Sequence, residues 1–139
     1  MKRIILVLAM LFSANAASAE DSPAANDAFK AIITQQLQAI ANDDGASAYA
    51  EAAPNVQKIF PSPEVFMNMV RGGYPQIYHN KQYSFGDSGT DAAGRPFQKV
   101  EILSLDGVRY EGIYFMERQP DGAWKISGVI MAQVEGSEA

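Results

Sequence analysis

The sequence predicts an α+β protein with two layers, in which three helices in the first half of the chain pack on one face of an antiparallel sheet of about four strands. Two patterns predict this class. Apolar residues recur at the helical period of about 3.6 in the first half, and from Gln82 onward the period becomes two. The length of 139 residues suits a single domain.

The first 19 residues are typical of a secretory signal segment. Lys2 and Arg3 precede nine apolar residues at positions 4–12, and small residues follow up to Ala19. A membrane-spanning helix needs about 20 apolar residues, so we interpret residues 1–19 as a cleaved signal peptide. The sequence therefore predicts an exported protein, periplasmic or secreted, with one mature domain over residues 20–139.

The first predicted helix spans residues 23–42. Ser22 is a suitable N-cap, and Pro23 suits the first helical position. The sequence Asp43-Asp44-Gly45 ends the pattern. The apolar residues of this helix form one stripe, made of Phe29, Ile32, Ile33, Leu37 and Ile40.

Two shorter helices are predicted next. Asp44 is placed to cap a helix over residues 46–52, which ends before Pro54. Another helix begins after the cap Ser62 and ends before Gly72. The apolar residues on one side of this helix are Val65, Phe66, Met69 and Val70.

The predicted strands span residues 82–87, 97–105, 108–118 and 123–133. Asp106-Gly107 favours a type I′ hairpin turn, which needs a positive φ at both central residues. Pro120-Asp121-Gly122 predicts the next hairpin. The last three strands are therefore expected to form an antiparallel meander.

Alternation along each strand predicts which side chains face the helices. Three charged residues of the strand 108–118, Arg109, Glu111 and Glu117, take odd positions, so we expect the mostly apolar even positions to face inward. The residues expected to face inward are Tyr83, Phe85, Val100, Ile102, Tyr110, Gly112, Tyr114, Met116, Trp124, Ile126, Gly128 and Ile130. The apolar residues left on the outer face are Leu103, Leu105, Ile113 and Phe115. Either this face is partly covered, for instance by a second copy in a homodimer, or the faces are assigned the wrong way round.

Composition limits the available chemistry. The chain has no cysteine, a single histidine and a formal net charge of −5. These counts favour neither a metal site nor a bound cofactor, so none is predicted. The absence of Lys and Arg clusters also predicts no nucleic-acid partner and, once the signal is removed, no membrane partner.

Five residues are candidates for a pocket between the first helix and the sheet. Gln36 lies in the middle of the apolar stripe, where its amide either bonds a neighbouring group of the protein or bonds a ligand. Tyr114 and Trp124 are expected to line the same interior space, with Tyr74 and Tyr78 at its mouth. Apolar walls with a few hydroxyl groups are typical of small-molecule sites.

Two segments carry a resemblance to known proteins: PSPEVFMNMVRGGYP at residues 61–75 and YFMERQPDGAWKISG at residues 114–128. They resemble a family of exported bacterial proteins known only as a domain of unknown function. The order of elements resembles the cone-shaped fold shared by nuclear transport factor, ketosteroid isomerase and polyketide cyclases. The resemblance covers most of residues 26–131 and implies this curved fold and export, but no activity. Residues 55–61 replace a β-hairpin of many cone proteins, so no catalytic residue is carried over.

The sequence predicts an exported, non-catalytic domain that binds a small apolar ligand or a protein partner. The alternative is a cone-fold enzyme, an isomerase, cyclase or hydrolase, that uses the same pocket. An isomerase-like site needs an inward carboxylate in an apolar setting, and Asp87 is the only Asp or Glu at an inward strand position. His79 is interpreted as an exposed loop residue, with an acid or base at the pocket rim as the alternative.

Overall fold

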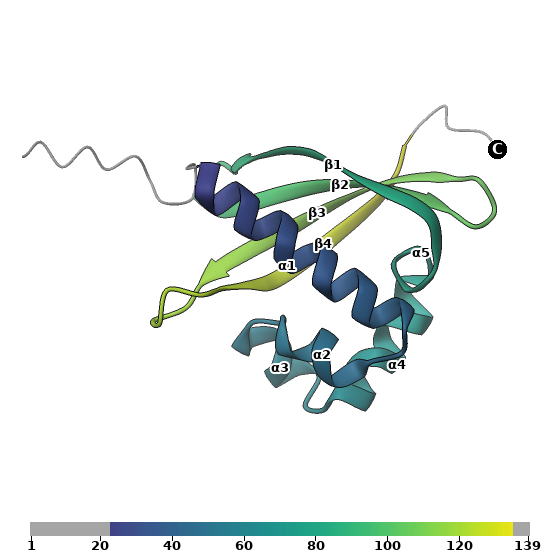
Figure 1. Ribbon diagram of the computed structural model, residues 1–139, viewed down its shortest axis with the longest axis horizontal. Helices are drawn as coiled ribbons and strands as arrows, with labels where there is room; N and C mark the ends of the chain where they lie inside the picture. Colours follow the sequence, from purple (N-terminus) through teal and green to yellow (C-terminus); the bar gives the residue numbers. More distant parts are fainter. Residues whose placement is uncertain (1–22, 135–139) are drawn as a thin grey trace, which may run out of the picture.

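Helices occupy the first half of the described chain and strands the second half (Figure 1). The computed structural model describes residues 23–134, so the predicted signal peptide and the Ser22 cap lie outside the described residues. The elements are α1 (Pro23–Ala41), α2 (Gly45–Ala50), α3 (Pro54–Ile59), α4 (Pro63–Gly73), α5 (Pro75–Tyr78), β1 (Asn80–Thr90), β2 (Pro96–Ser104), β3 (Arg109–Arg118) and β4 (Trp124–Gln133). The α+β class is confirmed, as is an antiparallel sheet of four strands in the order β1-β2-β3-β4.

Five helices lie within residues 23–134, where the sequence predicts three. The two additional helices, α3 and α5, contain six and four residues. Pro54 and Pro75 begin them, which is a favourable position for proline because the first helical N–H needs no partner within the helix. Helices this short complete too few turns to produce a recognisable apolar period, so the sequence pattern does not reveal them.

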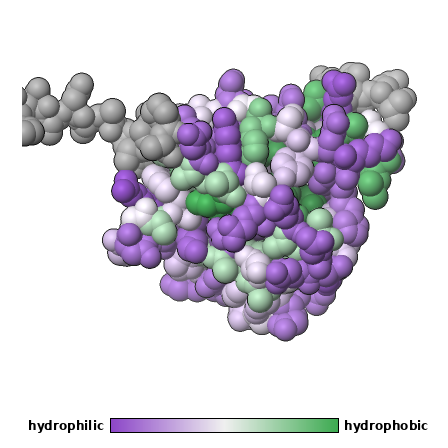
Figure 2. Space-filling view, viewed as in Figure 1, coloured by the Kyte–Doolittle hydropathy of each residue, from purple (hydrophilic) through white to green (hydrophobic). Residues whose placement is uncertain are grey.

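Helix α1 crosses one face of the sheet and supplies the centre of the core (Figure 1). Its predicted stripe is confirmed, because Phe29, Ile33, Leu37 and Ile40 are buried. The ring of Phe29 packs edge-on against Trp124 of β4, with 4.9 Å between the ring centroids. Figure 2 shows that polar side chains cover most of the face on this side, with small apolar patches between them.

The predicted caps of α2 and α4 are confirmed. The carboxylate of Asp44 accepts a hydrogen bond from the backbone N–H of Ser47 at 3.2 Å. The hydroxyl of Ser62 accepts one from the backbone N–H of Val65 at 3.2 Å. Helix α2 ends at Ala50, earlier than predicted, because the following residues pair with the edge of β4 instead.

The predicted hairpin between β2 and β3 is confirmed, but its turn is not of type I′. Gly107 has a φ of 85°, whereas Asp106 is not among the described residues with a positive φ. The backbone N–H of Gly107 donates to the carbonyl oxygen of Ser104 at 3.0 Å. A tight turn followed by one left-handed glycine is typical of hairpin loops longer than two residues.

A β-bulge interrupts the regular pairing of β4 with β3. Met116 pairs with Ile126, but the preceding residue of β3, Phe115, pairs with Gly128. Ser127 is therefore an additional residue in β4, opposite no residue of β3. An additional residue exchanges the two faces of the strand for every position that follows it.

The faces predicted for the second half of β4 are consequently wrong. The alternation of the strand predicts that Gly128 and Ile130 face the helices, but Ile130 pairs with Ile113 on the outer face and is 52% exposed. Val129 and Met131 pack against the core in their place. No alternation in the sequence reveals this exchange, because a bulge shifts the register without changing the composition of the strand.

Part of the outer face is covered by the chain itself. The guanidinium of Arg95, in the loop before β2, lies 4.2 Å from the centre of the Phe115 ring. Asp91 holds this guanidinium through an ion pair of 2.8 Å. Phe115 is thereby only 8% exposed, although the alternation of β3 directs its side chain away from the helices.

Candidate functional site

A cavity of about 280 Å³ lies between the helices and β4. This volume is close to the lower limit for small-molecule sites, about 300 Å³. Most lining residues are apolar, and among them are Ile40 of α1, Val70 of α4, Ile77 of α5 and Val129 of β4. None of the lining residues, all of which belong to the described part of the chain, is Asp, Glu, Lys, Arg or His. The cavity therefore suits an uncharged, apolar molecule.

The backbone that follows α2 builds one side of this cavity. The N–H of Ala53 donates to the carbonyl oxygen of Ile126 at 2.8 Å, and the N–H of Ile126 donates to the carbonyl oxygen of Glu51 at 2.9 Å. Pro54 then begins α3, so the chain leaves the edge of β4. Beyond the bulge, Val129 faces the helices and lines the cavity at the sheet.

Gln36 lines the cavity from α1 and is only 4% exposed. Its amide nitrogen, Nε2, donates a hydrogen bond to the carbonyl oxygen of Ala48 in α2 at 3.2 Å. The same carbonyl oxygen also accepts a bond from the backbone N–H of Glu51 at 3.2 Å. The structure therefore agrees with a bond from the Gln36 amide to a neighbouring group of the protein, and it also places this side chain where a ligand could contact it.

Tyr74 is the second sequence candidate that lines the cavity.

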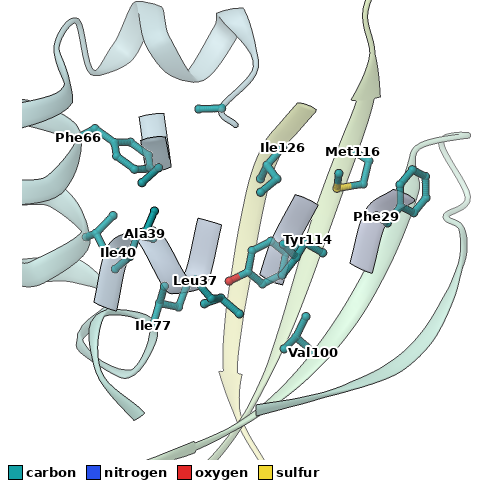
Figure 3. Close-up of a cluster of buried hydrophobic side chains, with 14 of the residues drawn as sticks. Phe29, Leu37, Ala39, Ile40, Phe66, Ile77, Val100, Tyr114, Met116 and Ile126 are labelled. Atoms are coloured by element: carbon teal, nitrogen blue, oxygen red, sulfur yellow. The ribbon is translucent and has the colours of Figure 1, made fainter. Parts of the chain in front are cut away.

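Tyr114 is fully buried, and burial in apolar surroundings raises the pKa of its hydroxyl. Figure 3 shows the ring of Tyr114 extending from the sheet, with its hydroxyl oxygen directed toward Leu37 and Ile77. This hydroxyl has no hydrogen-bond partner among residues 23–134, and Tyr114 is not part of the cavity lining.

Two other candidates lie elsewhere. Trp124 packs against Phe29 in the core and does not line the cavity. Tyr78 donates its hydroxyl to Asp43 and stacks on His79, with 3.9 Å between ring centroids. The structure thus brings Gln36 and Tyr74 together in one space, and places Tyr114, Trp124 and Tyr78 outside it. His79 is exposed and is not a lining residue.

Sequence reasoning missed the wall that α3 and α4 contribute. The residues on this wall are Val56, Ile59, Phe60, Phe66 and Met69. Ile59 is 68% exposed, which is unusual for a large apolar side chain beside a cavity. Val56 and Phe60 are four residues apart, a spacing that places both on one face of a helix, but no helix is predicted from the sequence over residues 55–61.

The lining offers little for catalysis. Proton transfer needs a carboxylate, imidazole or amine near the reacting atom, and the lining residues carry none. Within residues 23–134, no group of three or more His, Cys, Asp or Glu side chains is placed to hold a metal ion. The available chemistry is apolar contact together with hydrogen bonds from a few amide and hydroxyl groups.

Comparison with known proteins gives a family but no activity. A family model described as "Domain of unknown function (DUF4864)" matches residues 22–139. No curated protein matches the chain. Among the described helices, none has the length and apolar character needed to cross a membrane.

Proposed function

We propose that this chain, which belongs to the family described as "Domain of unknown function (DUF4864)", is a non-catalytic domain that binds a small apolar ligand. The observation that supports this proposal is the uncharged cavity of about 280 Å³ between α1, α4 and β4. It has room for about nine groups the size of a water molecule, at about 30 Å³ each. A ligand of about that many non-hydrogen atoms matches the space.

Binding is favoured over catalysis by the position of the ionisable groups. The sequence alternative, an isomerase, cyclase or hydrolase, needs an acid or base beside the ligand. Asp87, the only carboxylate expected at an inward strand position, is exposed and is not a lining residue. Within residues 23–134, the lining of the cavity includes no carboxylate, imidazole, amine or guanidinium group.

The experiment fills the cavity and measures binding. Val70 is buried on α4 and lines the cavity, so Val70→Phe adds volume to the wall. Val65, on the same helix, is exposed and does not line the cavity, so Val65→Phe is the matched control. Binding is measured by nuclear magnetic resonance, from the backbone amide shifts of residues 127–129 as 1-octanol or 2-octanone is added.

The wild type and Val65→Phe are expected to show saturable shifts, and Val70→Phe is expected to show none. The free energy of unfolding of Val70→Phe is expected to lie within about 1 kcal/mol of the wild-type value, because the added ring enters the cavity and not a filled core. Binding by Val70→Phe that equals the wild type would contradict the proposal, as would the lack of any saturable shift in the wild type.

We also propose that the protein is exported, to the periplasm or outside the cell, after cleavage of residues 1–19. The apolar segment 4–12 supports this proposal, together with the start of the family match at residue 22. N-terminal sequencing of protein from the extracytoplasmic fraction is expected to begin at Glu20. A sequence that begins at Met1 in that fraction would contradict cleavage.

We make two further proposals, one on the superfamily of the fold and one on a partner of the sheet. We propose a place in the cone-shaped superfamily, supported by α1 crossing one face of an antiparallel sheet (Figure 1). We propose a second copy of the chain as the partner of the outer face, where exposed Ile130 lies beside half-buried Ile113. Comparison of an experimental structure with cone proteins tests the first, and the molecular mass in solution tests the second.

A further inference from the structure

The orientation of the Gln36 amide is determined by its partner in α2. The partner is the carbonyl oxygen of Ala48, at 3.2 Å. A carbonyl oxygen only accepts hydrogen bonds, so the donating end of the amide, Nε2, must face it. The opposite end, the oxygen Oε1, then points away from Ala48. The contact with Ala48 therefore distinguishes the nitrogen end of the Gln36 amide from its oxygen end.

The free end of this amide is a hydrogen-bond acceptor inside the cavity. Gln36 lines the cavity and is 4% exposed, so its oxygen lies in apolar surroundings. Within the described chain, the bond from Nε2 is the one hydrogen bond of this side chain. The oxygen Oε1 has no donor within the described chain and lies in a mostly apolar lining, so a ligand that displaces solvent from the cavity must bring the donor itself.

The other polar groups of the lining do not impose the same requirement. The hydroxyls of Tyr74 and Ser127 rotate, and each serves as donor or acceptor. Asn55 is exposed, and its amide nitrogen already donates to the carbonyl oxygen of Ser127 at 3.1 Å. Gln36 is therefore the buried group of the lining whose chemistry is restricted to one role, that of acceptor.

We infer that the ligand is an uncharged apolar molecule with a single hydrogen-bond donor at its buried end, such as an aliphatic alcohol, and that Gln36 Oε1 accepts from it. This inference rests on the proposed function and names the ligand class of the same cavity. Anionic ligands such as fatty-acid carboxylates are disfavoured, because no lining residue within residues 23–134 carries a positive charge. Ligands with only an acceptor, such as ketones, bring a second oxygen toward Oε1 and leave both without a donor.

The experiment compares two ligands of equal size on two variants. 1-Octanol carries a donor and 2-octanone only an acceptor, and both have about the number of non-hydrogen atoms that the cavity accommodates. Gln36→Met keeps the length of the side chain and removes the acceptor. The Ala48 carbonyl oxygen retains its bond from Glu51 in this variant, so it is not left without a partner.

Gln57→Met is the matched control. The amide nitrogen of Gln57 also donates to a backbone carbonyl oxygen, that of Tyr49, at 3.0 Å, but Gln57 does not line the cavity. Both variants therefore lose a hydrogen bond from a glutamine amide to a backbone carbonyl oxygen, but only Gln36→Met loses an acceptor in the cavity. Dissociation constants are measured from the amide shifts of residues 127–129.

The wild type and Gln57→Met are expected to bind 1-octanol about three- to tenfold more tightly than 2-octanone, from one net hydrogen bond. In Gln36→Met the ratio is expected to fall to about one, mainly through weaker binding of 1-octanol. A wild-type ratio of one or below overturns the inference whether or not Gln36→Met folds, and so does an unchanged ratio in folded Gln36→Met. These results leave the proposed function standing, whereas the failure of both ligands to bind the wild type contradicts the proposed function itself.

Discussion

The hydroxyl of Tyr78 donates a hydrogen bond to the carboxylate oxygen Oδ1 of Asp43 at 2.7 Å. Arg71 donates to the same oxygen at 3.0 Å, and its guanidinium lies 5.5 Å from the centre of the Tyr78 ring. The three residues come from α5, α4 and the turn after α1, so this network joins three helices. Asp43 has a φ of 57°, a left-handed conformation that is common where a helix ends. Tyr78 therefore holds helices together at a distance from the cavity.

The first prediction concerns acid stability. Hydrogen bonds from Tyr78 and Arg71 hold the pKa of Asp43 below its usual value. A depressed pKa means that Asp43 stabilises the fold above about pH 4, and this contribution is lost as the pH falls through the folded-state pKa. Asp43→Asn is expected to lower the free energy of unfolding at pH 7. Because the variant has no carboxylate to protonate at this position, its free energy of unfolding is expected to decrease less than that of the wild type between about pH 4 and pH 2. Urea unfolding at pH 7 and across that pH range measures both.

The control for this prediction is Asp27→Asn, which removes an exposed carboxylate of α1 that lies outside the network. Asp43→Asn is expected to change the pH dependence more than this control does. The same pH dependence in both variants would show that the network with Tyr78 contributes nothing to folding at neutral pH.

The second prediction compares two tyrosine hydroxyls. Tyr114 is fully buried, and its hydroxyl has no partner within residues 23–134, whereas the Tyr49 hydroxyl donates to the carbonyl oxygen of Phe60 at 2.6 Å. Tyr114→Phe is expected to leave the free energy of unfolding unchanged or to raise it by up to about 1 kcal/mol, and Tyr49→Phe to lower it by about 1 kcal/mol. Urea denaturation measures both. A clear loss of stability in Tyr114→Phe would show that its hydroxyl has a bonded partner in solution.

The large elements could be predicted from the sequence because their patterns are long. The stripe that contains Phe29 and Ile40 repeats over several turns, and the alternation around Tyr114 extends over a whole strand. The bulge at Ser127 could not be predicted, because one additional residue has no compositional signature. The type of the turn at Gly107 also differed from the prediction, since Asp-Gly is compatible with more than one hairpin loop.

The candidate cavity could be predicted only in part. Gln36 was recognisable because a polar residue interrupts an apolar stripe, and the structure places it in the cavity wall. The alternation of β4 predicts that Trp124 faces inward as Gln36 does, but alternation does not say which inward residues fill the core and which line a cavity. The ring of Phe29 occupies the space beside Trp124, so that part of the interior is core. The wall around Val56 depends on α3, whose short length concealed it.

The third prediction concerns the outer face of the sheet. The Arg95 side chain covers Phe115, which is 8% exposed, and the exposed Ile130 lies on the same face. Arg95→Ala is expected to uncover the ring and to increase self-association of the chain, measured by sedimentation velocity over a range of concentrations. The lost cation–π contact is expected to lower stability by about 0.5–1 kcal/mol. Arg95→Lys keeps the charge and most of the stem, and is expected to associate less than Arg95→Ala.

The last prediction tests the bulge through two glycines. An added Cβ at Gly128 would meet only the Cδ2 atom of Phe115, at 4.0 Å, and Gly128 does not have a positive φ. Gly128→Ala is therefore expected to stabilise the protein by about 0.5–1 kcal/mol, because alanine loses less backbone entropy in a strand. Gly122 has a φ of 88° in the turn before β4, so Gly122→Ala is expected to destabilise by about 1–2 kcal/mol. Urea unfolding measures both. If Gly128→Ala instead lost stability, position 128 would lie in the packed interior, as the simple alternation of the strand predicts, and the register of β4 beyond Ser127 would be wrong.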